Sequence, residues 1–458
     1  MHPPRPMPRD RPPGRTSGSL SKLQESCPAD AKRSPVVEAG DKQITPSAAD
    51  QSVAALALTR AGRPAAVNDR LFRRIPRTLL LGAGGFLGAI SWQVVVPVLP
   101  LHLSRIGYTA PQIGILISIL SLAMGVVEMQ VGWIVGAFGR RQTLVGGLVA
   151  NAACMALVAL ARMAALVASA LAAIGIARAT LWPPLHATVA DTASAETRGR
   201  AFGIFWFWTS VAFLTGPLIG GLVAAHYGDR SAFYLGAAFS LLAIPVVSAV
   251  TSGGRDAARV SSARVGDVLG DVTFLRLCIV NHLYYSMAGI WMTFLPLYMA
   301  RRGLSVEVVG LVLTVQGFTY ALVQIPTGRL ADRFGPEWIV LPAIGGRALI
   351  ATLLPIFQVQ SSAGFLIAGA LYGFAGGMIP VTFTTLVSRM VRQEKYTTAM
   401  GIYNSSGDLG FFIGPLLGGV AALLGIRAAF LLCLPLGTAS ALIALTGIAA
   451  AERSQEPL

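Results

Sequence analysis

The sequence predicts an all-α membrane protein with twelve transmembrane helices in two pseudo-symmetric six-helix bundles. Three observations support this fold class. Hydrophobic residues make up 54% of the chain and charged residues only 12%, too few to cover the surface of a soluble protein of this length. Twelve apolar runs follow one another, each near the roughly 20 residues that a membrane-spanning helix needs. The second half of the chain also repeats the first.

The repeat is visible in short identical stretches. Leu99-Pro100-Leu101 recurs as Leu295-Pro296-Leu297, 196 positions later, and Arg105 meets Arg301 at the same offset. A second stretch recurs at an offset of 198, where Gly216-Pro217-Leu218-Ile219-Gly220-Gly221 becomes Gly414-Pro415-Leu416-Leu417-Gly418-Gly419. A membrane protein with two similar halves can rock them about a central site.

The predicted elements follow the apolar runs in order. Residues 1–77 are polar, basic and rich in proline, which predicts a disordered cytoplasmic tail. The first bundle is expected at 78–250, with helices over 78–103, 112–136, 142–160, 164–190, 200–225 and 230–250. A cytoplasmic linker at 251–273 joins the halves. The second bundle is expected at 274–450, with helices over 274–300, 306–328, 338–358, 362–390, 397–424 and 426–450, before a tail at 451–458.

The distribution of charge predicts the orientation. The net charge of +15 does not indicate nucleic-acid binding, because the arginines lie in the tail and between apolar runs rather than on one face. With the N-terminus inside, the predicted cytoplasmic connections carry more basic residues than the external ones, so both termini are expected in the cytoplasm. The excess of arginine over lysine suggests GC-rich coding DNA and hence a bacterial inner membrane. Contact with membrane lipid and a monomeric state are expected.

One motif, present in two copies at the predicted cytoplasmic ends, resembles that of the major facilitator superfamily of secondary transporters, and the resemblance covers about residues 78–450. The pattern Gly-x-x-x-Asp-Arg-x-Gly stands after the second helix of the second half. The first-half copy keeps its glycines and an arginine pair, but Gly136 replaces the aspartate. The matching residues are Gly328, Asp332, Arg333 and Gly335 in the second half, and Gly132, Gly139, Arg140 and Arg141 in the first.

The resemblance implies that this motif forms a cytoplasmic gate. Its glycines make a tight turn, and its aspartate docks at the start of a neighbouring helix, where free N–H groups favour an anion. Asp332 is then expected near Arg198 to Ala201 at the start of the fifth helix. The matching contact from Gly136 cannot form, which predicts an asymmetric gate.

A glycine ladder in the eleventh helix resembles the antiporter motif of that superfamily. Gly410, Gly414 and Gly418 recur every four residues and therefore share one helix face, followed by Gly419. Small residues there permit close approach of a neighbouring backbone, and Pro415 can bend the helix. The fifth helix carries the related set Gly216, Pro217, Gly220 and Gly221. Ordinary tight packing and a sliding seam that blocks proton leakage are both open interpretations.

Two acidic residues stand inside apolar helices, where a charge costs about 2.5–3.5 kcal/mol. Asp408 lies near the middle of the eleventh helix, with Asn404 one turn away on the same face. Glu128 lies in the second helix, and its repeat partner is Gln324. Both acids are candidates to carry a coupling proton, and a structural packing role is the alternative for each.

A cationic and aromatic face is the candidate substrate site. Arg178 and Trp182 are one helical turn apart in the fourth helix, so they share a face with His186 unless Pro183-Pro184 shifts the register. The resemblance implies that the first, fourth and seventh helices line a cavity. Aromatic and amide side chains there would suit an amphipathic molecule. Arg347 in the ninth helix is expected to extend toward the cytoplasm. The further candidates for the cavity are Trp92, Gln93, Asn281, Tyr284, Tyr285, Gln316 and Tyr320.

These features predict a secondary active transporter that works by alternating access. The favoured function is proton-coupled efflux of a drug-like or amphipathic small molecule. A carrier of sugars, organic anions or other metabolites is the alternative, and a membrane sensor that does not transport is a third. The sequence contains no Gly-Lys-Ser/Thr phosphate loop and no His/Cys cluster with metal-ligand spacing, so no ATP, metal, cofactor or enzymatic activity is expected.

Overall fold

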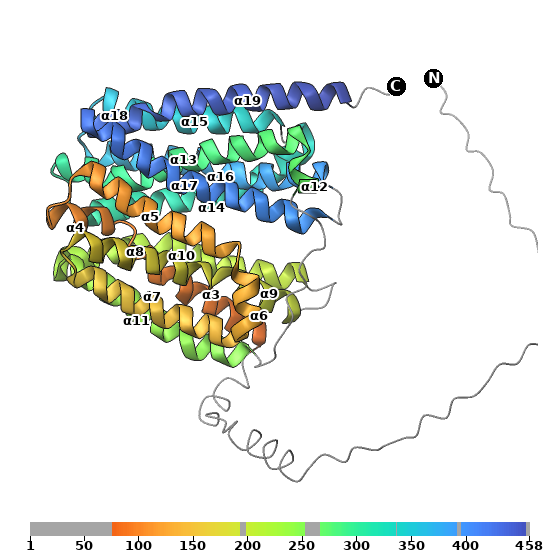
Figure 1. Cartoon of the computed structure of the whole chain (residues 1–458). Coiled ribbons are helices and arrows are strands. Elements are labelled where there is room, and N and C mark those ends of the chain that lie inside the picture. Colours follow the sequence, from red (N-terminus) through yellow and green to blue (C-terminus); the bar gives the residue numbers. More distant parts are fainter. Residues whose placement is uncertain (1–75, 193–197, 252–265, 336, 392–394, 455–458) are drawn as a thin grey trace, which may run out of the picture. The chain divides into compact units, whose positions relative to one another are not determined.

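The computed structural model describes residues 76–192, 198–251, 266–335, 337–391 and 395–454, and all regular elements in these ranges are helices (Figure 1). The helices of the first half are α3 (Arg77–Gln93), α4 (Leu99–Arg105), α5 (Ala110–Glu128), α6 (Val131–Phe138), α7 (Arg140–Leu160), α8 (Ala164–Ala179), α9 (Trp182–Thr192), α10 (Arg198–Tyr227) and α11 (Asp229–Val250).

The second half begins with the short α12 (Gly266–Leu269), which lies in the predicted linker. It continues with α13 (Val272–Arg301), α14 (Val306–Phe334), α15 (Glu337–Ile356), α16 (Ser362–Met390), α17 (Tyr396–Ala421), the 3-10 turn η2 (Ala422–Leu424), α18 (Ile426–Leu431) and α19 (Cys433–Ser454). In Figure 1 the orange-to-light-green helices α3–α11 form one group and the green-to-blue helices α13–α19 another.

The backbone itself repeats between the halves. Three pairs of glycines with positive φ end or separate helices at matching points of the two halves. A side chain would strain the backbone at these angles, so glycine is required there. The repeat therefore extends to the places where the chain turns. The pairs are Gly107 and Gly303 (φ 107° and 79°), Gly139 and Gly335 (85° and 89°), and Gly228 and Gly425 (86° and 114°).

Four of the predicted continuous helices are broken in the structure. The first is interrupted between Gln93 and Leu99, where Pro97 supplies no N–H and Pro100 starts the next helix. The fourth is interrupted before Pro183-Pro184, which remove two more donors. The second breaks after Glu128 into α5 and α6, and nothing in the local sequence explains this. The twelfth breaks at Leu432 into α18 and α19, just before Pro435.

Ten helical stretches of the described residues are long and apolar enough to cross a membrane. The first and seventh predicted helices are not among them. The first is divided into the shorter α3 and α4, and α13 has 30 residues but carries the polar Asn281 and His282 within its apolar stretch. Each of the twelve predicted spans nevertheless corresponds to a helix or a broken pair of helices.

Glycine faces let helices of the same half lie against one another. A methyl group at Gly410 or Gly414 of α17 would overlap the carbonyl oxygen of His282 or Ser286 on α13. In the first half, Gly220 of α10 is placed in the same way against Val94, in the turn that follows α3. These contacts bring backbones close together, as small residues permit in membranes.

The two halves meet through α5 against α17 and α10 against α14. A methyl group at Gly114 of α5 would overlap the carbonyl oxygen of Pro415, and one at Gly310 of α14 would overlap that of Pro217. The Ser118 hydroxyl also donates a hydrogen bond across this contact to the Phe412 carbonyl oxygen, at 2.8 Å.

These contacts lie toward the end of the molecule that carries Arg105, here called the Arg105 end. Toward the opposite, Arg140 end, a methyl group at Gly132 or Gly203 would meet no described atom within 4 Å. The tightest contact between the halves is therefore at the Arg105 end.

We expect Gly114→Leu to separate the halves at the Arg105 end, because the new side chain would displace the backbone of α17. The rate at which a water-soluble maleimide labels a cysteine introduced by Ser118→Cys should rise several-fold. Gly146→Leu is the matched control, since a side chain at Gly146 meets no described atom within 4 Å. Unchanged labelling in the Gly114 variant would contradict a closed Arg105 end.

Candidate functional site

Two carboxyl groups meet where the halves contact each other. Glu128, at the end of α5, and Asp408, in the middle of α17, lie close enough for their side chains to hydrogen-bond when one of them is protonated. Both side chains are partly buried. Gly125 of α5 lies beside Asp408, because a methyl group there would be in ordinary van der Waals contact with Cβ of Asp408, at 3.5 Å.

A hydrogen bond between two carboxyl groups requires a proton. An ionised carboxyl group only accepts hydrogen bonds, so at least one member of the pair must be protonated to donate. Two ionised carboxylates at this distance would repel each other strongly in a medium of low dielectric constant. The pair can therefore bind one proton. Loss of that proton would weaken the attraction between the halves.

A guanidinium group lies beside this pair. Arg178, near the end of α8, is within electrostatic range of Glu128, and its Cζ lies 4.6 Å from the centre of the Trp92 ring on α3. Its Nη1 atom is buried and has no hydrogen-bond partner among the described residues. The first half thus places a cation and an aromatic ring next to the carboxyl pair.

Three of the predicted cavity residues make hydrogen bonds within the second half. Asn281 donates to the Tyr403 carbonyl oxygen and to Ser406 Oγ, both at 2.9 Å. Gln316 accepts from the Trp291 indole at 2.8 Å, and the Tyr284 hydroxyl donates to the Gly376 carbonyl oxygen at 2.7 Å. In this conformation these side chains join helices.

The other predicted cavity residues are more scattered. Tyr285 packs edge-on against Tyr284 and lies within electrostatic range of Asp408. Tyr320 is half-buried and Asn404 is exposed, whereas Gln93 is buried against Gly216 of α10.

The fourth helix shows the register shift that the Pro183-Pro184 pair was expected to allow. The break between α8 and α9 separates Arg178 from Trp182 and His186. Trp182 packs edge-on against Phe205, and His186 packs against Phe205 as well. Both therefore face α10, whereas Arg178 faces Trp92. The proline pair removes the register that the spacing assumed.

The prediction for Arg347 is wrong. Its side chain is 5% exposed and does not extend out of the helix bundle. The guanidinium Cζ lies 4.4 Å from the Tyr284 ring and 4.2 Å from the Tyr372 ring. Tyr372 was not among the predicted site residues. It lies in the tenth predicted helix, which the repeat matches to the fourth, and that match could have singled it out.

The gate motif is described only in part. Gly139 and Gly335 make the turns after α6 and α14, and Arg140 forms an ion pair with Asp191 at the end of α9, at 2.6 Å. Arg141 and Arg333 are exposed. The side chains of Asp332 and Arg198 lie outside the described residues, so the contact expected between Asp332 and the start of α10 stays a prediction.

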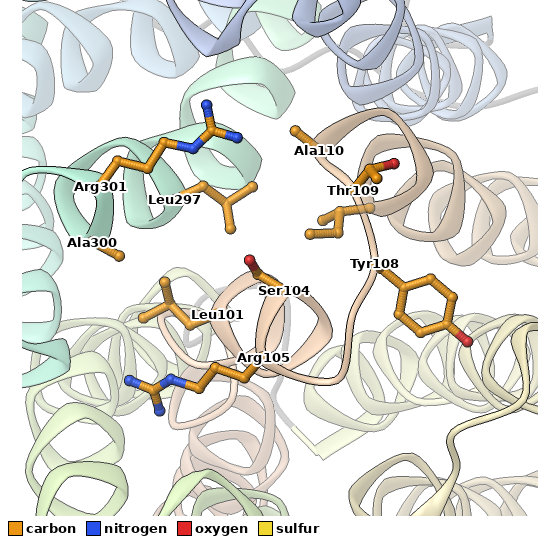
Figure 2. A pocket seen from close by; sticks show the side chains of 10 residues that line it. Leu101, Ser104, Arg105, Tyr108, Thr109, Ala110, Leu297, Ala300 and Arg301 are labelled. Carbon is orange, nitrogen blue, oxygen red and sulfur yellow. The ribbon is translucent and has the colours of Figure 1, made fainter.

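A cavity of about 290 Å³ lies between the halves at the Arg105 end. Figure 2 shows side chains of α4 and the start of α5 on one side of it and those of α13 on the other. Its lining includes the repeat-related pairs Leu101 with Leu297 and Arg105 with Arg301. Arg105 is paired with the buried Asp229. None of the predicted substrate or proton residues lines this cavity.

The family model of the Major Facilitator Superfamily matches residues 81–264 and 277–457. Among curated proteins, the multidrug resistance protein MdtG of Salmonella paratyphi A is 27% identical over 364 residues, covering 76% of this chain and 89% of the relative. MdtG of Escherichia coli O9:H4 is also 27% identical, over 366 residues, with 76% and 88% covered.

Solved transporters share the fold. The nucleoside transporter NupG superposes with a TM-score of 0.70 at 13% identity, covering 82% of this chain and 99% of that one. A bacterial homologue of the human lysosomal transporter Spinster, in an inward-facing and unoccupied conformation, gives 0.63 at 16% identity, with 81% and 95% covered. The matched model, the repeated helices and the expected membrane fold agree, and the chain belongs to the major facilitator superfamily.

Proposed function

We propose that the protein is a secondary active transporter that exports a drug-like or amphipathic small molecule in exchange for protons. The observation that carries this proposal is the close approach of Glu128 and Asp408 at the contact between the halves. This pair places a candidate proton site on the contact between the halves, which must open and close in alternating access.

Competition between proton and substrate would couple the two fluxes. A proton shared by the pair would hold α5 and α17 together. Loss of that proton leaves two like charges in contact, which weakens the attraction of α5 for α17. A hydrogen-bond donor or positive group of a substrate can take the place of the proton, so binding of one favours release of the other.

The substrate class rests on the first half of the site. Arg178 and Trp92 together offer a planar cation and a large aromatic face, to which a ring system can stack. The related MdtG proteins are named multidrug resistance proteins, which supports efflux of such compounds. The substrate leaves chemically unchanged, so the protein is not an enzyme.

The orientation follows from the basic connections of the Arg140 end. If that end faces the cytoplasm, the described conformation is closed on the external side. Both termini then lie on the cytoplasmic side of an inner membrane. Arg140 and Asp191 then tie α7 to α9 at the cytoplasmic side.

A carrier of organic anions is the second candidate. The observation that favours it is Arg347, a buried guanidinium that has no ion-pair partner within 4 Å among the described residues. A negative substrate group would offset the cost of that charge within the membrane.

Purified protein in vesicles distinguishes the candidates. A panel of amphipathic cationic dyes and of organic anions would be tested for flux with and without an imposed proton gradient. Dye movement that requires the gradient supports the proposal. Exchange of anions that ignores the gradient supports the second candidate, and absence of any flux overturns both.

We expect Glu128→Gln to abolish gradient-driven dye transport, with a loss of at least about tenfold, because an amide cannot release a coupling proton. Dye exchange between the two sides without a gradient should remain, since the amide still hydrogen-bonds to Asp408. Glu307→Gln is the matched control, because that carboxyl group lies outside the pair, near His226 at the Arg105 end. Full gradient-driven transport in the Glu128 variant would show that the carboxyl group is structural.

The double variant Glu128→Gln, Asp408→Asn should lose no more gradient-driven transport than the more damaging single variant. Two groups that share one proton act as a unit, so their effects do not add. The initial rates of dye flux in all four proteins give this comparison. Independent, multiplying losses would mean that the two acids act at separate steps.

A further inference from the structure

The three first-half residues of the candidate site each stand where a helix is broken. Trp92 is the second-last residue of α3, Glu128 is the last residue of α5, and Arg178 is the second-last residue of α8. In each case a turn separates that helix from the next one, which is α4, α6 or α9. The breaks of the first half therefore lie beside the residues that meet at the site.

The backbone hydrogen bonds become shorter in sequence at these breaks. The carbonyl oxygens of Trp92 and Arg178 accept from N–H groups three residues later in the chain, at 2.9 and 3.1 Å. The N–H of Gln130 donates in the same way to the Val127 carbonyl oxygen, at 2.9 Å. An α-helix spans four residues with each such bond. A tighter turn of this kind inside a longer helix often marks a hinge.

The matching positions of the second half lie inside unbroken helices. At the two repeat offsets, the partners of the three residues are, in order, Ala288, Gln324 and Gly376. They belong to α13, α14 and α16, which run without interruption for 30, 29 and 29 residues. Each of these helices contains an internal proline, so a proline by itself does not decide where a helix breaks.

A break of the second half lies elsewhere, at Leu432 between α18 and α19. It falls about two turns after α18 begins. Neither acid of the carboxyl pair and none of the predicted cavity residues lies on α18 or α19. Beside the site, the described breaks therefore all belong to the first half.

A stack of side chains joins the unbroken helices of the second half. The Arg347 guanidinium of α15 lies 4.4 Å from the Tyr284 ring of α13 and 4.2 Å from the Tyr372 ring of α16. Trp291 of α13 stacks on Tyr372, with ring centres 3.9 Å apart and an interplanar angle of 8°. The Trp291 indole N–H donates to Gln316 Oε1 of α14, at 2.8 Å. This tyrosine–arginine stack thus connects four helices.

Two hydroxyl groups of the stack also hold the backbone at the matching positions. Tyr284 donates to the Gly376 carbonyl oxygen at 2.7 Å. Tyr372 donates to the Met287 carbonyl oxygen, next to Ala288, at 3.1 Å. Each such bond between buried groups contributes about 0.5–1.5 kcal/mol. Bending α13 or α16 at these points would break them.

The first half lacks every one of these side chains. At the repeat offsets, Tyr284, Tyr372, Trp291 and Gln316 correspond to Gly88, Ile174, Val95 and Leu120. None of the four replacements carries a hydroxyl, amide or indole group that could tie one helix to the next. The half without the stack is the half whose helices are broken beside the site.

We propose that the first half bends at these three breaks during the transport cycle, whereas the second half moves as one rigid body. The segments α3, α6 and α9 lie on the Arg140 side of the breaks and swing about them. Space is open there, because a methyl group at Gly132 of α6 or Gly203 of α10 would meet no described atom within 4 Å. The tyrosine–arginine stack keeps α13, α14 and α16 straight.

Bending of the first half would change the site directly, because Trp92, Glu128 and Arg178 each lie within two residues of a break. An ion or ligand that alters the contacts among these three residues therefore favours one bent form over the other. This link to transport rests on the proposed function. The unequal bending of the halves does not, since it requires neither a particular substrate nor a proton.

Distances between spin labels in the full chain, in lipid nanodiscs, test the unequal bending. Labels on genetically encoded non-natural amino acids at Phe138 and Ser248 join α6 to α11. The repeat-matched pair at Phe334 and Thr446 joins α14 to α19, and both phenylalanines are exposed. Each pair lies within one half, so rigid rocking of the halves leaves both distances unchanged.

The trigger is a leucine that forces the halves apart at the Arg105 end, either Gly114→Leu in the first half or Gly310→Leu in the second. In both variants the first-half distance should shift by several ångströms, while the second-half distance keeps its native distribution. A shift that follows the half carrying the leucine would be a local distortion and would overturn the proposal. Equal behaviour of the two pairs, shifted or unshifted, would overturn it as well.

The role of the stack is tested by the double variant Tyr284→Phe, Tyr372→Phe, which keeps both rings and removes both hydroxyl groups. Amide hydrogen exchange in peptides that contain Met287 or Gly376 should accelerate by about tenfold or more, because local opening becomes easier. Tyr298→Phe is the matched control, since that hydroxyl accepts from Arg302 within α13 and its neighbour. It should leave exchange at Met287 and Gly376 unchanged.

The double variant should also allow the second-half distance to shift when Gly114→Leu is added. Unchanged exchange, or a second-half distance that stays native, would show that the stack does not keep this half straight and would overturn its role. These measurements use no dye and no proton gradient. Unequal bending in a protein that moves no dye would thus refute the proposed function and leave this inference standing.

Discussion

The close contact of α5 with α17 is the constraint on which the site depends. Glycines at the Arg105 end let the two backbones touch, and this contact brings Glu128 of one half against Asp408 of the other. A carboxyl pair in a low-dielectric region is stable only while it holds a proton or a substitute for it. The same helices that close the molecule at one end therefore carry a charge-sensitive group further along.

The two halves share a backbone but differ in how they hold a buried cation. In the second half, Arg347 is enclosed by two tyrosine rings. In the first half, the Arg178 guanidinium lies over a single ring, that of Trp92, and within electrostatic range of Glu128. A guanidinium that lies over one ring can change partners at smaller cost than one enclosed by two rings. The half with Arg178 is thus better suited to respond to a proton on Glu128.

Much of the fold could be predicted from the sequence because membrane helices carry strong local signals. Apolar length located the spans, and glycines such as Gly139 and Gly335 stood where the backbone needs a positive φ. Broken helices were harder to predict. The proline pair Pro183-Pro184 indicated one break. The break after Glu128 has no signal in the local sequence, and contacts between helices decide there whether the helix continues.

The sequence by itself determined the helical membrane class, the repeat, and which polar residues stand in apolar surroundings. Glu128, Asp408 and Arg178 could each be singled out because an ionisable group in a membrane helix is costly and therefore marks a candidate functional site. Only the tertiary structure decided that the two acids meet, that Arg347 is enclosed and that Arg178 lies over Trp92. Helix period shows which face a residue occupies, but the partner of that face is set by the packing of helices far apart in the chain.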